Sequence, residues 1–205
     1  MAGGTVLSTG VQYLDQSMTG QQTVFVRHLG NGSLDGSFGT NGFITLPDST
    51  GLTLIDSSDR IYLAELNGTV TRMSSTGAVD GGYAGGNAVT NVHVNSMQFD
   101  SAGRVVTFGW VLDGGARRGY ISRLDTNGDP DVTFNTTGIL FFDFPLPLAA
   151  PAAGSPLCVG TVQPGDKLII ACEVTPAGDT PPSDIAIARL NAGGTLDTTF
   201  GVTQP

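Results

Sequence analysis

Residues 189–201 read Arg-Leu-Asn-Ala-Gly-Gly-Thr-Leu-Asp-Thr-Thr-Phe-Gly, and the pattern in this stretch decides the fold because it occurs four times. In each copy a Gly lies five residues after an Arg, an Asp eight residues after it, and an aromatic residue eleven residues after it. The Arg, Asp and aromatic residues of the four copies are Arg27, Asp35 and Phe38; Arg72, Asp80 and Tyr83; Arg123, Asp131 and Phe134; and Arg189, Asp197 and Phe200. Fixed spacing within the copies and variable spacing between them predicts a repeat protein.

A second pattern lies between the copies and predicts β-hairpins. A turn with a basic residue, followed by a short apolar run, occurs at residues 59–64, 103–108 and 166–171. Each run is typical of the second strand of a hairpin. Residues 5–10 resemble the same strand without its hairpin partner, and a third strand is expected to end at the repeated Arg, as in residues 184–189.

The composition favours short strands over helices. The chain has 30 Gly among 205 residues and only 13% charged residues, and Gly and β-branched residues lose conformational entropy in helices. Three to four short strands in roughly fifty residues match one propeller blade. We therefore predict an all-β repeat protein of four propeller-type blade units, three complete and two halves at the termini. The units form a single β-propeller-like domain over residues 1–205, with motif copies starting near residues 24, 69, 120 and 186.

The two patterns together resemble the delta-60 repeat family. The resemblance rests on residues 189–201 and on the stretch Asp100-Ser101-Ala102-Gly103-Arg104-Val105. It covers nearly the whole chain, and the second copy departs most, with Met73 in place of Leu. The resemblance implies a β-propeller-like fold in large bacterial secreted or surface proteins, and it supplies no catalytic motif.

The repeat count leaves three ways to complete the terminal blades. The two ends can join within the chain, neighbouring subunits can supply the missing strands, or the chain can be a piece of a longer array; the last two are favoured, because open sheet edges promote association. A homo-oligomer, such as a trimer, is therefore an expected partner.

Net charge restricts the partners and the location. A formal net charge of −9 disfavours nucleic acid and anionic membranes, since both demand clustered basic residues. No membrane-spanning segment and no signal peptide is visible in this chain. An extracellular, cell-surface or virion location is expected, with a glycan or a surface protein as the external partner; a cytosolic protein is the alternative.

Two cysteines flank a predicted hairpin turn. Cys158 and Cys172 are equidistant from Gly165, so they would face each other across the two strands. A cross-strand disulfide is then geometrically reachable. Two free thiols packed as small apolar residues are the alternative.

The repeated Arg, Asp and aromatic residues are interpreted as scaffold rather than as a set of ligand sites. A residue that occurs at the same position in every copy is expected to serve the fold that all copies share. The Asp can accept backbone N–H groups in a Gly-containing turn, the Arg can bind turn carbonyls or that Asp, and the aromatic ring can fill the space between units.

One turn resembles a calcium loop. Asp125, Asn127, Asp129 and Asp131 alternate oxygen ligands around Gly128, which suits a hard cation. The loop lacks a distant bidentate Glu, and the other copies place few acids there, so an ordinary turn is preferred and no cofactor other than this calcium is expected.

Function is expected where the copies differ. Three stretches stand out, at residues 11–18, 110–120 and 144–151, and we expect variable loops there. The last is apolar and rich in Pro, as in a subunit contact. The candidate ligand-binding residues in the first two are Tyr13, Trp110, Arg117, Arg118 and Tyr120, because aromatic residues and Arg anchor interfaces and stack on sugar rings. Core packing at a strand end is the alternative for Trp110.

The leading hypothesis is a non-enzymatic binding or structural module of an extracellular assembly, such as an adhesin head, a fibre tip or a virion surface protein. The alternative is a propeller-type hydrolase or lyase that uses acids lining a central channel, with or without a metal. No catalytic constellation is visible to support it.

Overall fold

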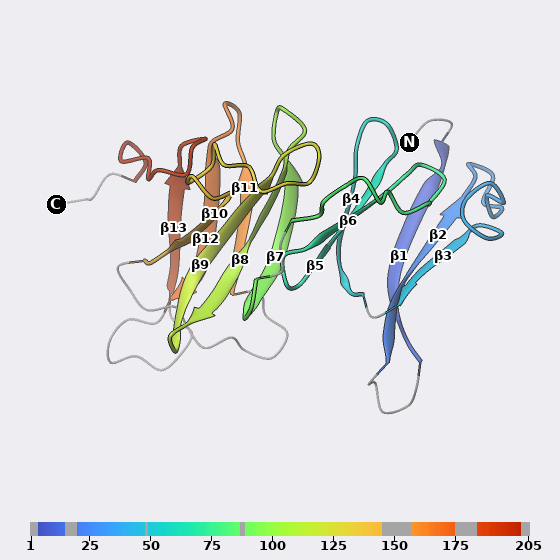
Figure 1. The fold of residues 1–205 in the computed structure, drawn as a ribbon, viewed down its shortest axis with the longest axis horizontal. Helices are drawn as coiled ribbons and strands as arrows, with labels where there is room; N and C mark the ends of the chain where they lie inside the picture. Colours follow the sequence, from blue (N-terminus) through green and yellow to red (C-terminus); the bar gives the residue numbers. More distant parts are fainter. Residues whose placement is uncertain are drawn as a thin grey trace. The chain divides into compact units, whose positions relative to one another are not determined.

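The computed structural model describes residues 4–14, 20–47, 49–86, 89–144, 157–174 and 184–201. Within these ranges the regular structure consists of β-strands, which form four small antiparallel sheets and no α-helix (Figure 1). The predicted all-β class is confirmed. No sheet closes on itself in the described residues, and the number of blades stays a prediction. Among the same residues there is no helix with the length and apolar character needed to cross a membrane.

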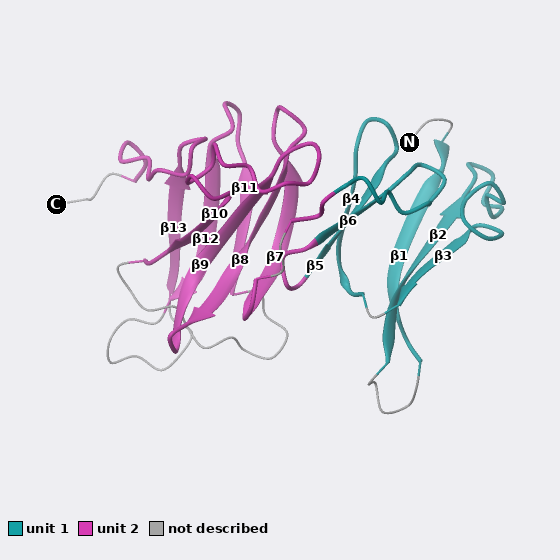
Figure 2. Cartoon of the chain, viewed as in Figure 1, with its two compact units in different colours: residues 1–65, 70–83 teal, residues 66–69, 84–205 magenta. Residues whose placement is uncertain are grey.

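The described contacts divide the chain into two compact units (Figure 2). Unit 1 comprises Met1–Glu65 and Val70–Tyr83, and unit 2 comprises Leu66–Thr69 and Ala84–Pro205. Each unit holds two of the four sheets. The single domain expected over residues 1–205 remains a prediction.

Unit 1 contains two three-stranded antiparallel sheets, ordered β1-β2-β3 and β4-β5-β6. Their strands are β1 (Val6–Tyr13), β2 (Gln21–His28), β3 (Phe43–Pro47), β4 (Gly51–Ile55), β5 (Ile61–Glu65) and β6 (Val70–Met73). The apolar core joins the two sheets: Phe25 of β2 and the repeat aromatic Phe38 are fully buried together with Ile61, Leu63 and Met73.

Unit 2 contains a four-stranded sheet, ordered β10-β9-β8-β7, and a three-stranded sheet, ordered β11-β12-β13. Their strands are β7 (Val92–Phe99), β8 (Val105–Asp113), β9 (Ala116–Leu124), β10 (Ile139–Phe142), β11 (Cys158–Val162), β12 (Leu168–Val174) and β13 (Asp184–Leu190). Val106, Phe108 and Ile121 of the first sheet pack against Leu168 and Ile170 of the second.

The strands follow the repeat. The repeated Arg lies in the third strand of each repeat, namely in β2, β6, β9 and β13. In two copies the chain returns after the motif as a fourth strand: β3 pairs with β2, and β10 pairs with β9. Strand β1 occupies the position of a second strand, and among the described residues it pairs only with β2, in agreement with the interpretation of residues 5–10.

The expectation of a variable loop over residues 110–120 is wrong. These residues form the end of the β8–β9 hairpin, in which Trp110 pairs with Gly119 and Asp113 with Ala116. Gly114 and Gly115 both have positive φ, 56° and 86°, as a two-residue hairpin turn requires. The two consecutive glycines were the available signal for this turn. The stretch was interpreted as a loop because it is longer than in the other copies.

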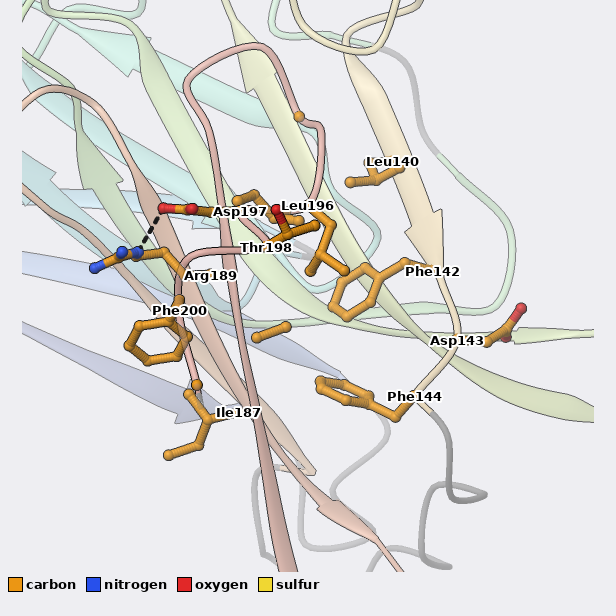
Figure 3. Close-up of a pocket in the computed structure, with 14 residues that line it drawn as sticks. Leu140, Phe142, Asp143, Phe144, Ile187, Arg189, Leu196, Asp197, Thr198 and Phe200 are labelled. Carbon is orange, nitrogen blue, oxygen red and sulfur yellow. Dashed lines mark hydrogen bonds and ion pairs between the residues drawn. The ribbon is translucent and has the colours of Figure 1, made fainter. Parts of the chain in front are cut away.

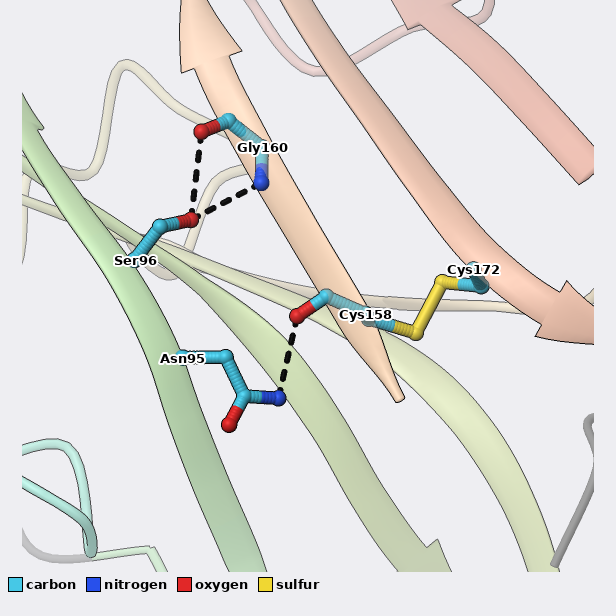
Figure 4. Close-up of a disulfide and its surroundings, with 5 residues drawn as sticks. All are labelled: Asn95, Ser96, Cys158, Gly160 and Cys172. Carbon is cyan, nitrogen blue, oxygen red and sulfur yellow. Dashed lines mark hydrogen bonds between the residues drawn. A yellow bond between two sulfur atoms is a disulfide. The ribbon is translucent and has the colours of Figure 1, made fainter. Parts of the chain in front are cut away.

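Polar side chains of β7 hold the edge of the neighbouring sheet in unit 2. A β-bulge between Val94 and Ser96 lets the consecutive residues Asn95 and Ser96 both reach β11. Asn95 donates to the carbonyl of Cys158 at 3.0 Å, and the Ser96 hydroxyl accepts the Gly160 N–H at 2.8 Å (Figure 4). The backbone groups of this edge strand are therefore satisfied by side chains rather than by another strand.

We predict that Gly109→Ala lowers the free energy of unfolding by about 1–3 kcal/mol, the usual cost of overpacking. An added Cβ at Gly109 would lie 1.9 Å from the carbonyl oxygen of His93, and backbone on both strands would have to move. Urea denaturation measures the effect. Gly10→Ala is the control, because nothing lies within 4 Å of its added Cβ; equal stability of the two variants would contradict the predicted close approach of β7 and β8.

Candidate functional site

Each repeat binds its own Arg between a carboxylate and an aromatic ring. The Nε atom of the Arg donates to the Asp eight residues later, at distances between 2.7 and 2.9 Å in all four copies. The guanidinium carbon lies between 4.4 and 5.0 Å from the centre of the aromatic ring, a cation–π distance. The repeated residues thus contact one another within each copy.

The repeated Asp also closes the turn that follows it. Its second oxygen, Oδ1, accepts the backbone N–H two residues later, and in three copies also the hydroxyl of that residue, which is Ser37, Thr133 or Thr199. The sequence analysis missed these hydroxyl residues, although Ser or Thr at this spacing in three of four copies was a visible signal.

These hydrogen bonds lower the pKa of the repeated carboxyls. For Asp35 the largest cause is the Ser37 hydroxyl, and for Asp80 it is the hydrogen bond from Arg72; the pKa of each lies below the ordinary 3.8. Burial alone would raise the pKa of Asp131, but Thr133 and Arg123 outweigh it and the pKa is lowered. The Lys167 ammonium beside Asp197 holds the pKa of that carboxyl far below its usual range.

The Arg and the aromatic residue also contact the turn of the next copy. Arg27 donates through Nη1 to the Ser75 carbonyl, and Arg123 donates to the Ala192 carbonyl at 2.6 Å. The N–H that follows the aromatic residue donates to the next carbonyl of the same turn, from Gly39 to Thr76 at 2.9 Å and from Asn135 to Gly193 at 3.0 Å. We call this set of contacts the repeat joint; in unit 2, Ala84 donates to the Asn127 carbonyl in the same manner.

The two sequence patterns meet at the repeated Asp. Arg104, the basic residue of the second pattern, donates to Asp131 at 3.0 Å, and Lys167 donates to Asp197 at 2.6 Å. Both patterns were identified in the sequence, but their contact was not predicted. A basic residue at the same position in each second pattern was the available signal.

Burial separates the ion pairs that stabilise the fold from those that do not. The side chains of Arg123 and Asp131 are 3% and 8% exposed, and removing one partner of such a pair costs about 3–5 kcal/mol. Arg60, which pairs with Asp56, is 44% exposed, and such surface pairs are worth about 0–1 kcal/mol. The buried Arg123–Asp131 pair therefore stabilises the scaffold.

We predict that acid destabilises the protein because of these carboxyls. Their pKa values are lower in the folded chain than in the unfolded chain, so the folded state binds fewer protons, and stability that is present above pH 4 is lost as the pH falls below it. Urea denaturation between pH 7 and pH 2 measures the loss. Asp131→Asn should lower stability at pH 7 and flatten this dependence, because it removes one carboxyl with a lowered pKa; an undiminished pH dependence in this variant would contradict the assignment.

The structure joins Cys158 and Cys172 by a disulfide (Figure 4). The two residues are directly paired between β11 and β12, the cross-strand position expected from their spacing around Gly165. Both are buried and belong to the apolar core of unit 2. The bond therefore links the two strands at the end opposite their turn.

The turn that resembled a calcium loop does not gather its oxygen atoms. Oδ1 of Asp125 accepts the N–H groups of Asn127 and Asp129 at 2.8 and 3.0 Å, while Asp131 binds Arg123 and Arg104. No group of three or more His, Cys, Asp or Glu side chains is placed to hold a metal within the ranges that the structure describes. Asp125, Asn127 and Asp129 therefore form a turn, and Asp131 belongs to the ion pairs of the repeat.

Two candidate ligand residues lie together on the β8–β9 hairpin. Trp110 and Arg117 project from the same face, with the guanidinium carbon 5.8 Å from the indole centre. His93, the partner of Trp110 on β7, stacks on the indole with the ring centres 4.2 Å apart and an angle of 10° between the planes. Nε of Arg117 is buried without a hydrogen-bond partner among the described residues. We call His93, Trp110 and Arg117 the aromatic cluster.

Strand alternation places the other two hairpin candidates on the opposite face. Arg118 binds Asp113 at 3.0 Å and Asp143 at 2.9 Å. Tyr120 is only 1% exposed, and burial raises the pKa of its hydroxyl. The assignment of Tyr120 to an accessible binding site is therefore wrong, because it points into unit 2.

Tyr13, the remaining candidate, lies at the end of β1 and is 51% exposed. It belongs to unit 1 and the aromatic cluster to unit 2. Residues 15–18 and 145–151 of the two other stretches singled out in the sequence lie outside the described residues. Trp110 is partly buried beside the core of unit 2, so it contributes to core packing, and its role in ligand binding stays a prediction.

An apolar pocket of about 850 Å³ follows the outer edge of β13 (Figure 3). Phe142 and Phe144 line one side, and Leu196 and Phe200 of the fourth motif line another. In the β7–β10 sheet the fourth strand, β10, pairs with the corresponding edge of β9. The pocket thus lies along a strand edge that has no partner strand in the described residues.

Comparison with protein families finds a match to a domain of unknown function (DUF5122) described as a beta-propeller, over residues 103–134 and 163–200. Each matched stretch runs from the second pattern to the aromatic residue of the motif, in copies three and four. The match supports a propeller-type repeat. A comparison with curated proteins finds no significant match.

Proposed function

We propose that the chain is a non-enzymatic binding module of an extracellular assembly, such as an adhesin head, a fibre tip or a virion surface protein. Its external partner is a glycan or a surface protein, which contacts the aromatic cluster. The repeats act as a rigid scaffold that presents this cluster.

One observation carries this proposal: the charged and aromatic residues shared by all copies are engaged in the scaffold, whereas the aromatic cluster occurs once. The repeated Arg, Asp and aromatic side chains contact each other within each copy, and in the first and third copies the Arg also contacts the following copy. His93 is exposed and lies flat on Trp110, with Arg117 nearby. A flat ring beside a cation suits the C–H face and the hydroxyl groups of a sugar, or an aromatic side chain of a protein.

The disulfide supports the proposed location. Disulfides persist in oxidising compartments and are rare in the reducing cytosol. The Cys158–Cys172 bond is buried in the core of unit 2, where it is shielded from exchange with external thiols. It therefore favours the extracellular assembly over the cytosolic alternative.

The repeats are further proposed to be delta-60 repeats that form four blade units. The supporting features are the quoted pattern of residues 189–201 and the propeller-type family match. The four sheets, each of which contributes one repeated Arg, support the count of four.

We predict that Arg117→Ala and His93→Ala each weaken glycan or protein binding by about tenfold, the effect of losing roughly 1.4 kcal/mol at an interface. An array of immobilised glycans, together with a panel of purified surface proteins, identifies the ligand, and calorimetry measures the affinity of each variant. Trp110→Ala should remove binding.

Arg118→Ala is the matched control, because Arg118 lies on the same hairpin but on the opposite face. Its affinity should equal that of the unchanged protein, and so should that of Tyr13→Ala in unit 1. Absence of binding across the array and the panel, or an equal loss in Arg118→Ala, would overturn the proposal.

A further inference from the structure

The fourth copy carries the Arg and the aromatic residue that form the donor half of the repeat joint, but no turn of another copy contacts them in the described residues. Arg189 binds Asp197 and lies over Phe200 as in the other copies. In the first and third copies the corresponding Arg and aromatic residue also contact the turn of the next copy. Phe38 and Phe134 are fully buried there, whereas Phe200 is half-buried.

The sheet face beside this half joint is uncovered in the same way. The residue two positions before the repeated Arg is 0% exposed for Phe25, 3% for Val70 and 0% for Ile121, but 56% for Ile187. Its neighbours on this face are exposed as well, with Ile185 at 70% and Val159 at 40%. Three of four copies therefore bury an apolar residue at this position, and the fourth presents it to solvent.

The acceptor half of the joint is uncovered in the first copy. In the fourth copy, the turn carbonyls of Ala192 and Gly193 accept the contacts of the third copy. The corresponding residues of the first copy are Gly30 and Asn31, which are exposed. Gly32 has open space around it, whereas its counterpart Gly194 lies against the Phe134 ring.

The sheet beside that turn offers a complementary surface. Val6 of β1 is 57% exposed and Phe43 of β3 is 42% exposed. A shallow hollow of about 350 Å³ lies on this sheet, and Gly10, Val24 and Val26 are among the residues that line it. One uncovered surface therefore presents exposed isoleucines, and the other an apolar hollow.

We infer that the two surfaces bind each other between chains: the Arg189–Phe200 half joint and the Ile187 face of one chain bind residues 30–32 and the β1–β2 face of a second copy. The contact repeats the joint already formed twice within the chain, with Arg189 donating to the Gly30 carbonyl and the Gly201 N–H donating to the Asn31 carbonyl. A contact between two different surfaces is heterologous, so it builds a ring or a filament rather than a two-fold dimer.

Sedimentation velocity over a hundredfold range of concentration tests this inference on the full chain. The mass should rise with concentration, and Ile187→Lys should hold the protein at the monomer mass. Val79→Lys is the matched control: Val79 is 57% exposed and lies on neither surface, so this variant should associate normally. A constant monomer mass, or equal association of Ile187→Lys, would overturn the inference.

Disulfide trapping identifies the occupant. A chain carrying Asn31→Cys is mixed with a chain carrying Gly201→Cys. The position of Gly201 accepts a side chain, because the corresponding residue of the third copy is Asn135, which also has a positive φ. Rapid formation of the mixed dimer supports the second copy, with Ser57→Cys replacing Asn31→Cys as the control. A chain that carries both Asn31→Cys and Gly201→Cys should form cross-links between chains. If this double variant instead cross-links within a single chain at all concentrations, the second copy is not the occupant and the inference fails. Neither experiment involves the aromatic cluster, so ligand binding can fail while association succeeds, and the reverse.

Discussion

The structure depends on the guanidinium group of each repeated Arg, which can contact a carboxylate, an aromatic ring and a carbonyl at the same time. The Arg of each repeat binds the Asp of its own turn and lies on the aromatic ring of that turn. In the first and third copies it also reaches a carbonyl of the next copy. Only Arg has the planar set of donors that this geometry demands. The group therefore connects local turn structure to the packing of successive repeats.

The sequence predicted the strands and the scaffold residues because each repeats at fixed spacing. The same spacing of Arg, Gly, Asp and an aromatic residue in four copies indicated a shared structural role. The equal distance of Cys158 and Cys172 from Gly165 placed these two residues opposite each other across the hairpin. Contacts between distant patterns were not predicted. The binding of Arg104 to Asp131 depends on how β8 pairs with β9, and the binding of Asn95 to the Cys158 carbonyl depends on how two sheets pack. No local spacing encodes either contact.

The candidate site was predicted less well than the scaffold, for a physical reason. Residues 110–120 contain the residue types of a binding loop, but the two glycines at 114 and 115 close a tight hairpin. Strand alternation then sends adjacent side chains to opposite faces, so Arg117 joins Trp110 while Arg118 and Tyr120 turn away. The composition of the segment therefore identified residue types that suit a binding site, and only the strand register shows which of them share a face. His93 was missed because it lies on another strand.

The repeated Arg holds the joint between copies, and amide hydrogen exchange at Asn135 tests this role most directly. The Asn135 N–H donates to the Gly193 carbonyl, next to the bond from Arg123 to Ala192. In Arg123→Lys this amide should exchange at least tenfold faster than in the unchanged protein. The Gly128 amide, which donates to Asp125 within its own turn, should keep its rate. Unchanged protection of Asn135, or an equal acceleration at Gly128, would contradict the account.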